Sequence, residues 1–103
     1  MSASRRPRFL LDLAEELFWL KEMAGAEVAE RWCEEVLATI QFLEDCPMAG
    51  RVRKDLSPAG IRSWRVHGFP RWLIFYEVTP EGGLVFYRLR CGTMNLPGVK
   101  MKS

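Results

Sequence analysis

The spacing of apolar residues changes once along this chain, and that change limits the fold more than any other feature. Up to residue 45 the apolar residues recur at steps of three and four, which is the period of a helix with one buried face. From residue 61 apolar and polar residues tend to alternate, which is the period of strands. A helical half followed by a strand half predicts an α+β domain in which helices cover one face of a sheet.

Two helices are expected, over residues 9–24 and 26–45. Pro7 suits a first helical turn, where a missing N–H breaks no hydrogen bond, and Gly25 ends the first helix. With so short a connection, the two helices must fold back as an antiparallel hairpin. Their apolar stripes are Leu10, Leu13, Leu17, Leu20 and Ala24 in the first, and Ala29, Trp32, Cys33, Val36, Leu37, Ile40 and Leu43 in the second.

Three strands are expected, over residues 61–67, 71–79 and 84–91, with a loop over 48–60 and a tail over 92–103. Residues 2–6 have little strand character. Alternation in the third strand places one set of residues on one face, which leaves one side of the sheet for the helices and the other side polar and basic. The set is Leu84, Phe86, Arg88 and Arg90. The prediction is a helical hairpin packed on a small antiparallel sheet of three to four strands.

Charge is divided between the two halves. Residues 1–50 carry five basic and ten acidic groups, a net −5, and residues 51–103 carry ten basic and three acidic groups, a net +7, which together give the +2 of the chain. Such asymmetry favours an acidic partner for the basic half, either a nucleic acid or an acidic peptide.

Several classes of protein are disfavoured. The three cysteines are odd in number and lack a metal-ligand spacing, and His67 is the only histidine, so we expect no metal and no cofactor. No apolar run approaches the roughly 20 residues that cross a bilayer, so we expect a cytoplasmic protein. We expect one domain over residues 1–103, with its core over about 9–97 and short tails.

Several segments resemble the ParE/RelE toxin superfamily, and its ParE-like branch most. They are the pattern around Asp12 and Leu13 that leads into the helix pair, PMAGRVR at 47–53, IRS at 61–63 followed by RWLIFYEV at 71–78, and RLRCG at 88–92. The chain departs from RelE-like members after Gly92, where Thr93 and Met94 replace the expected Arg or Lys, and it lacks their C-terminal Tyr. Cys91 stands where many relatives have His.

The resemblance implies the toxin of a type II toxin–antitoxin pair, bound by an antitoxin in a hetero-oligomer. The first hypothesis is a ParE-like toxin that inhibits DNA gyrase by binding, without catalysis. The second is a RelE-like ribosome-dependent mRNA endonuclease, and the third is a degenerate member that has lost toxicity. Catalytic candidates under the second hypothesis are Arg62, Arg65, His67, Arg88 and Arg90.

Other residues are candidates for contact with the target or the antitoxin. Arg51, Arg53 and Lys54 form a basic cluster, although a solvated loop would have the same composition. Trp64 and Trp72 could form an apolar patch for an antitoxin, and Tyr76 is grouped with them, although core packing is an equally ordinary use of these rings. An open edge strand would accept an added antitoxin strand.

Overall fold

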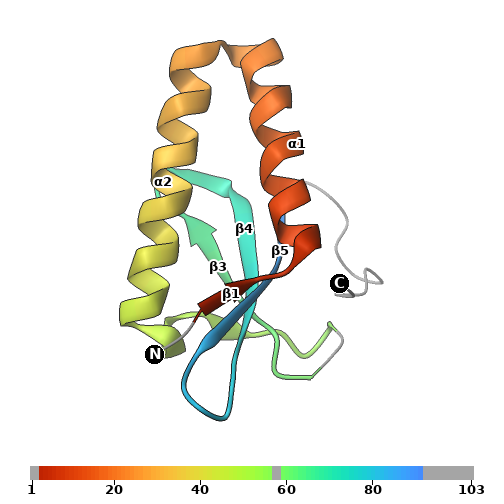
Figure 1. Ribbon diagram of the computed structural model, residues 1–103, viewed down its shortest axis with the longest axis vertical. Coiled ribbons are helices and arrows are strands. Elements are labelled where there is room, and N and C mark those ends of the chain that lie inside the picture. The colour runs from red at the N-terminus through yellow and green to blue at the C-terminus, as the bar shows by residue number, and fades with distance from the viewer. Residues whose placement is uncertain (1–2, 57–58, 92–103) are drawn as a thin grey trace.

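The computed structural model describes residues 3–56 and 59–91 (Figure 1). The predicted tail at 92–103 therefore lies outside the described residues. Two helices come first in the chain and most of the strands follow, as the change of apolar period predicts. The elements are β1 (Ala3–Arg5), α1 (Pro7–Ala24), α2 (Ala26–Asp45), a short 3₁₀ helix η1 (Pro47–Ala49), β2 (Arg51–Val52), β3 (Arg62–Val66), β4 (Phe69–Val78) and β5 (Leu84–Cys91).

The helical hairpin is confirmed. Pro7 is the first residue of α1, and Gly25 joins the helices with a φ of 97°, a conformation that glycine adopts without strain. The Gly25 N–H donates to the carbonyl oxygens of Leu20 and Lys21, at 3.2 Å each, and so closes the end of α1. Three members of the predicted stripes are wrong, because Leu10, Ala24 and Leu37 are exposed; in the first turn Phe9 is buried in place of Leu10.

The strands form one sheet in the order β1-β5-β4-β3-β2. The four strands β2 to β5 are antiparallel to one another where they pair, which confirms the predicted sheet. The expectation for residues 2–6 is wrong, because β1 pairs in parallel with β5 from Ala3 opposite Leu84 to Arg5 opposite Phe86. Three residues are too few to show an alternating pattern. Strands pair through main-chain hydrogen bonds, and these do not depend on which residues the added strand contains.

A β-bulge in β5 changes which residues face the helices. Phe75 lies opposite Arg88 and Tyr76 opposite Phe86, so Tyr87 has no partner on β4. Phe86 and, beyond the bulge, Leu89 both belong to the core under the helices. The predicted face that grouped Leu84 and Phe86 with Arg88 and Arg90 is therefore wrong, because simple alternation stops at Tyr87.

Apolar side chains are buried on both faces of the sheet. The main core lies between the sheet and the helices, with Trp32 of α2 fully buried and in edge contact with Trp72, at 6.0 Å between ring centroids. A second, smaller cluster contains Leu56, Ile61, Phe75 and Tyr87. Phe75 alternates along β4 with Ile74 and Tyr76 of the main core, so this cluster lies on the other face, which is only partly the polar surface that the sequence predicts.

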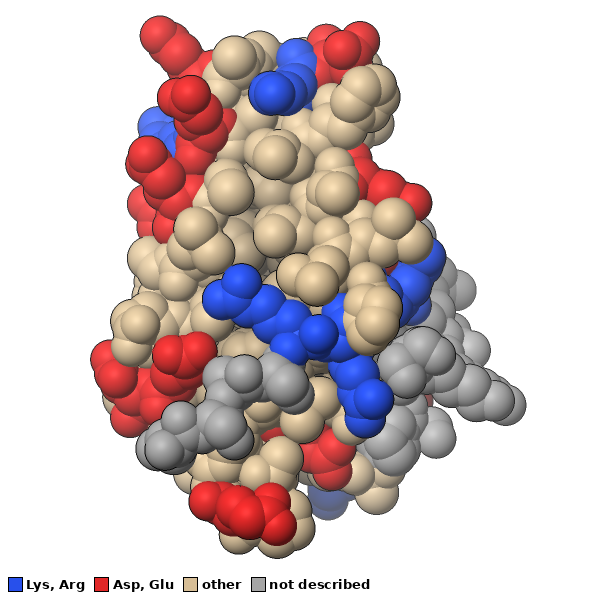
Figure 2. Space-filling view, viewed as in Figure 1, with Lys and Arg blue, Asp and Glu red and all other residues tan. Residues whose placement is uncertain are grey.

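The charge division of the sequence is visible on the surface. In Figure 2, which looks onto the helical hairpin, acidic side chains follow both outer flanks of the helices. Uncharged residues fill most of the surface between them, with one basic group near the top, and further basic side chains gather below. Neither of the two described helices is long and apolar enough to cross a membrane.

Candidate functional site

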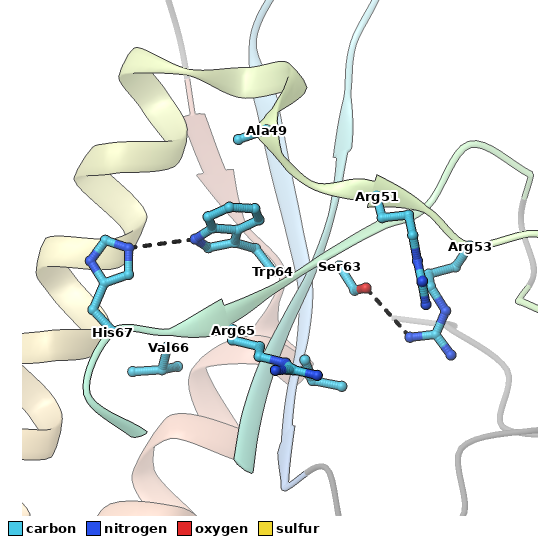
Figure 3. Close-up of a pocket in the computed structure, with 9 residues that line it drawn as sticks. Ala49, Arg51, Arg53, Ser63, Trp64, Arg65, Val66 and His67 are labelled. Atoms are coloured by element: carbon cyan, nitrogen blue, oxygen red, sulfur yellow. Dashed lines mark hydrogen bonds between the residues drawn. The ribbon is translucent and has the colours of Figure 1, made fainter. Parts of the chain in front are cut away.

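A cavity of about 430 Å³ opens where η1 and β2 meet β3 (Figure 3), and we call it the basic cavity. Short connections bring its walls together, because β2 pairs with β3 from Arg51 opposite Ser63 to Val52 opposite Arg62. None of the described residues that line it is acidic, although three are arginines. The lining residues are Ala49, Arg51, Arg53, Ser63, Trp64, Arg65, Val66, His67 and Leu73.

The three arginines of the basic cavity are in different states. Arg53 is held by Asp55 through two bonds, from Nε to Oδ1 at 3.0 Å and from Nη2 to Oδ2 at 2.8 Å, and it also donates to Ser63 Oγ at 3.4 Å. The hydrogen bond from Arg53 lowers the pKa of Asp55, so this carboxylate stays charged. Arg51 and Arg65 are exposed and make no hydrogen bond or ion pair with another described residue. These two cations are available to an anionic partner.

Trp64 and His67 form the aromatic side of the basic cavity (Figure 3). Trp64 Nε1 donates to His67 Nε2 at 3.5 Å. Phe42 of α2 stacks on Trp64, with ring centroids 5.5 Å apart, and contacts His67 edge-on at 5.4 Å. The His67 backbone N–H donates to Thr39 Oγ1 at 3.0 Å. The two rings are therefore held in place by α2.

Arg62 and Tyr76 hold the segment that carries Arg51. Arg62 Nη1 donates to the carbonyl oxygen of Gly50 at 2.7 Å. The Tyr76 hydroxyl donates to the carbonyl oxygen of Pro47 at 2.7 Å and accepts from the Gly50 N–H at 2.8 Å. Burial raises the pKa of Tyr76. The predicted partner contact by Tyr76 is wrong because the side chain is fully buried, and its role here is to fix the loop.

Arg88 is the main correction among the predicted site residues. It is buried, and its guanidinium donates to the Asp12 carboxylate of α1, from Nε at 2.7 Å and from Nη2 at 3.2 Å. Asp12 also accepts the backbone N–H of Leu89 at 3.0 Å. Arg88 therefore stabilises the contact between α1 and β5 and does not face a partner. Sequence reasoning missed Asp12, although a charged residue three positions after the buried Phe9 was a usable signal.

The remaining candidates are separated by the fold. Trp72 is nearly buried, and its Nε1 donates to Glu16 Oε1 at 2.8 Å, so the predicted patch of Trp64 with Trp72 is wrong. Arg90 is half-buried and Lys54 is exposed, and neither lines the basic cavity. Five candidates are brought together around it: Arg51, Arg53, Trp64, Arg65 and His67. Ser63 joins them as a residue that the sequence did not single out.

Metal chemistry has no obvious site in the described ranges, 3–56 and 59–91, where no group of three His, Cys, Asp or Glu side chains could hold an ion. The cysteines Cys33, Cys46 and Cys91 form no disulfide with one another.

Comparisons with known proteins place the chain in a family. The family model described as "ParE toxin of type II toxin-antitoxin system, parDE" matches residues 4–96. A solved structure titled "Chromosomal ParDE TA system from P. aeruginosa" resembles the fold with a TM-score of 0.73 at 17% identity, over 88% of this chain and 95% of that chain. A search of curated proteins finds no match. Because the family model covers most of its length, the chain belongs to the ParE toxin family of type II toxin–antitoxin systems.

Proposed function

We propose that this chain is the toxin of a type II pair, that it inhibits DNA gyrase by binding, and that an antitoxin neutralises it in the bacterial cytoplasm. The single observation that carries the proposal is the basic cavity, where Arg51 and Arg65 are exposed and form no ion pair with another described residue, and where none of the described lining residues is acidic. An acidic surface of gyrase, or the DNA that gyrase holds, is the kind of partner that such a cavity attracts.

Binding without catalysis is supported because Arg88 and Tyr76 already bind partners within the fold. Cleavage of RNA requires a base for the ribose 2′-OH, an acid for the leaving group and a cation at the phosphate. Arg88 is occupied by Asp12, and the Tyr76 hydroxyl is occupied by Pro47 and Gly50. Among the described residues that line the basic cavity, His67 is the one histidine, and no carboxylate or tyrosine lines it with His67. A single acid–base group does not supply both proton transfers directly.

Neutralisation by an antitoxin is supported by the sheet topology. β2 is an outer strand of the sheet and contributes Arg51 to the basic cavity. An extended acidic segment could add to this edge by main-chain hydrogen bonds and place carboxylates on the exposed arginines. The antitoxin would then cover the cations that the target needs, and toxin and antitoxin would form a hetero-oligomer.

The test uses the full chain and an Arg51→Ala/Arg65→Ala double variant. Arg71→Ala is the matched control, because Arg71 is an exposed arginine of β4 that does not line the basic cavity. Supercoiling by purified gyrase should be inhibited by the wild type and by the control, and inhibition should be lost in the double variant. Unchanged supercoiling, with cleavage of ribosome-bound mRNA by the same protein, would overturn the proposal.

The mRNA endonuclease remains the second candidate, because Arg65 and His67 share the basic cavity with Arg51. In that case His67→Ala would abolish cleavage of ribosome-bound mRNA while the circular dichroism spectrum stays unchanged. Arg88→Ala would lower cleavage only by destabilising the fold, because the Arg88 guanidinium forms an ion pair with the Asp12 carboxylate. The third hypothesis, a non-toxic member, predicts normal growth when the chain is expressed without an antitoxin.

A further inference from the structure

A second cavity, of about 440 Å³, opens between α1 and the sheet, and we call it the flank cavity. Its wall combines two carboxylates, two indole rings, a guanidinium and a thiol. The lining residues are Glu15, Glu16, Trp19, Arg71, Trp72 and Cys91. None of them lines the basic cavity, so the proposed function leaves this site without a role. Its volume lies within the range of about 300–1,000 Å³ that is usual for small-molecule sites.

One indole ring of the flank cavity is held in place and the other is exposed. Trp72 Nε1 donates to Glu16 Oε1 at 2.8 Å. The Trp72 ring also makes edge contacts with Trp32 and Phe69, at 6.0 and 6.1 Å between ring centroids. Trp19 is 51% exposed. Because the face of an indole ring carries partial negative charge, two such rings in one cavity favour an organic cation.

The carboxylates of the flank cavity have no cation of their own. Asp12, one turn earlier on α1, is paired with Arg88. Neither Glu15 nor Glu16 forms an ion pair with any residue of the described ranges, and Arg71, which lines the same cavity and is exposed, does not pair with them. With two carboxylates and one guanidinium, the wall of the cavity has a net charge of −1.

This combination favours an alkylammonium group over other ligands. An anion would meet two carboxylates and one guanidinium, which is unfavourable. A Mg²⁺ or Ca²⁺ ion takes about six or more oxygen ligands, and no group of three His, Cys, Asp or Glu side chains in the described part of the chain could hold an ion. An uncharged ligand would take water from the carboxylates and give them no partner. An ammonium group on an aliphatic stem satisfies both parts of the wall, because the cation meets the carboxylates and the stem meets the rings.

We propose that the flank cavity is a binding site for an alkylammonium group. Glu15 and Glu16 form its anionic side, and Trp19 and Trp72 form its aromatic side. Arg71 opposes the ligand through like charge, so its removal strengthens binding. The inference is independent of the proposed function, because the two cavities share no lining residue.

Two sources carry this chemistry: a free polyamine and a lysine of this chain. Residues 92–103 lie outside the described residues, but their sequence contains Lys100 and Lys102 and no acidic residue. They follow Cys91, which lines the flank cavity. A lysine side chain presents the same ammonium group on the same kind of stem as a polyamine, so the test has one arm for each source.

The probe is spermidine, and its binding to the full chain is measured by isothermal titration calorimetry. The dissociation constant should be about 1 mM or below. Magnesium chloride and an uncharged aliphatic diol of similar length should not bind. Glu15→Gln should weaken spermidine binding about threefold or more. Glu30→Gln is the control, because Glu30 is an exposed carboxylate of α2 that does not line the flank cavity, and it should leave binding nearly unchanged.

The aromatic side of the cavity is tested with the neighbouring rings Trp19 and Phe18. Both are on α1, with exposed fractions of 51% and 68%, and Trp19 lines the flank cavity whereas Phe18 does not. Trp19→Ser should weaken spermidine binding about threefold, and Phe18→Ser should leave it unchanged. Arg71→Ala should strengthen binding, which a mere disturbance of the cavity would not do.

The source of the ligand is tested with Lys100→Ala/Lys102→Ala. Its control is Arg51→Ala/Arg65→Ala, which makes the same change in net charge and leaves the flank cavity intact. If a free polyamine is the ligand, the two variants should bind spermidine equally. If the lysines of this chain occupy the cavity, the lysine variant should bind spermidine more tightly than both the wild type and the control.

Three results would overturn the inference: no spermidine binding by either the wild type or the lysine variant, equal binding of the diol or of magnesium, or equal losses in Glu15→Gln and Glu30→Gln. The last result would mean that spermidine is attracted by the acidic surface as a whole. The gyrase assay separates this inference from the proposed function. Glu15→Gln should inhibit supercoiling as the wild type does, because the basic cavity is intact.

Discussion

The strongest prediction concerns the buried ion pair between α1 and β5. Asp12 and Arg88 are 4% and 6% exposed, and the Asp12 carboxylate accepts three hydrogen bonds, two from Arg88 and one from the Leu89 N–H. Asp12→Leu removes all three and leaves the Arg88 charge buried without a partner. Breaking a buried pair in this way costs about 3–5 kcal/mol, which lowers the melting temperature of a domain of this size by roughly 12 °C or more.

The double variant Asp12→Leu/Arg88→Met separates the charge from the packing. It removes the buried cation as well, so the remaining cost is mainly the unsatisfied Leu89 N–H, about 1–3 kcal/mol. The second substitution should therefore restore about 2 kcal/mol of the stability that the first one removes. Arg8→Ala is the control, because Arg8 Nε lies 3.7 Å from Asp12 and its side chain is 39% exposed, which predicts a loss below about 0.5 kcal/mol.

The assay is urea unfolding followed by tryptophan fluorescence and circular dichroism. The free energies of unfolding of two variants are compared only where their m-values, the slopes of free energy against urea concentration, are equal. The reasoning is refuted if Asp12→Leu loses less than about 1 kcal/mol, which is the range of an exposed pair. It is also refuted if the double variant is less stable than Asp12→Leu alone, because the buried cation would then not be the source of the cost.

Three further predictions concern the loop that carries the basic cavity. Gly50→Ala should destabilise the fold by about 1–3 kcal/mol in urea unfolding, since a Cβ there would fall on the Tyr76 hydroxyl and within 2.7 Å of its Cε1 atom. Burial raises the pKa of Tyr76 from its usual 10.0. The stability that the protonated hydroxyl contributes is therefore fully present below pH 10 and is lost as the pH rises through the folded-state pKa. Urea unfolding from pH 8 to 11 should show a smaller loss of unfolding free energy in Tyr76→Phe than in the wild type. Asp55→Asn should release Arg53 from its carboxylate partner and raise the salt concentration that elutes the chain from heparin, more than the equal charge change Glu81→Gln does.

The sequence predicted the fold well wherever one local period was enough. The helices over residues 7–24 and 26–45 follow from apolar steps of three and four, and the antiparallel strands follow from alternation and turn residues. That Arg51 and Arg65 lie near one another could be predicted for a similar reason. β2, which carries Arg51, and β3, which carries Arg65, are close in sequence and pair directly. Their role toward a target stays a prediction.

What the sequence could not predict depends on pairs that are distant in the chain. Asp12 and Arg88 are 76 residues apart, and no local pattern states which carboxylate a buried arginine will meet. β1 is three residues long and pairs with β5, and so short a segment carries no pattern from which a strand could be predicted. Tyr76 was misjudged because an aromatic strand residue looks the same whether its hydroxyl faces a partner or, as here, two backbone groups of η1 and Gly50.

The bulge at Tyr87 helps to explain why Arg88 of β5 and Arg65 of β3, which β4 separates in the sheet, differ in burial. Without the extra residue, plain alternation would group Arg88 with Leu84 and Phe86, and the register with β4 would differ from Arg88 onward. With it, Arg88 lies opposite Phe75 and its guanidinium lies on Asp12, at the end of β5 that β1 does not cover. Arg65, on β3 where Arg65 and Leu73 pair in regular register, stays exposed at the basic cavity. Arg88 is therefore buried and paired with Asp12 while Arg65 stays exposed, so a count of basic residues on this sheet overstates the number of its exposed cations.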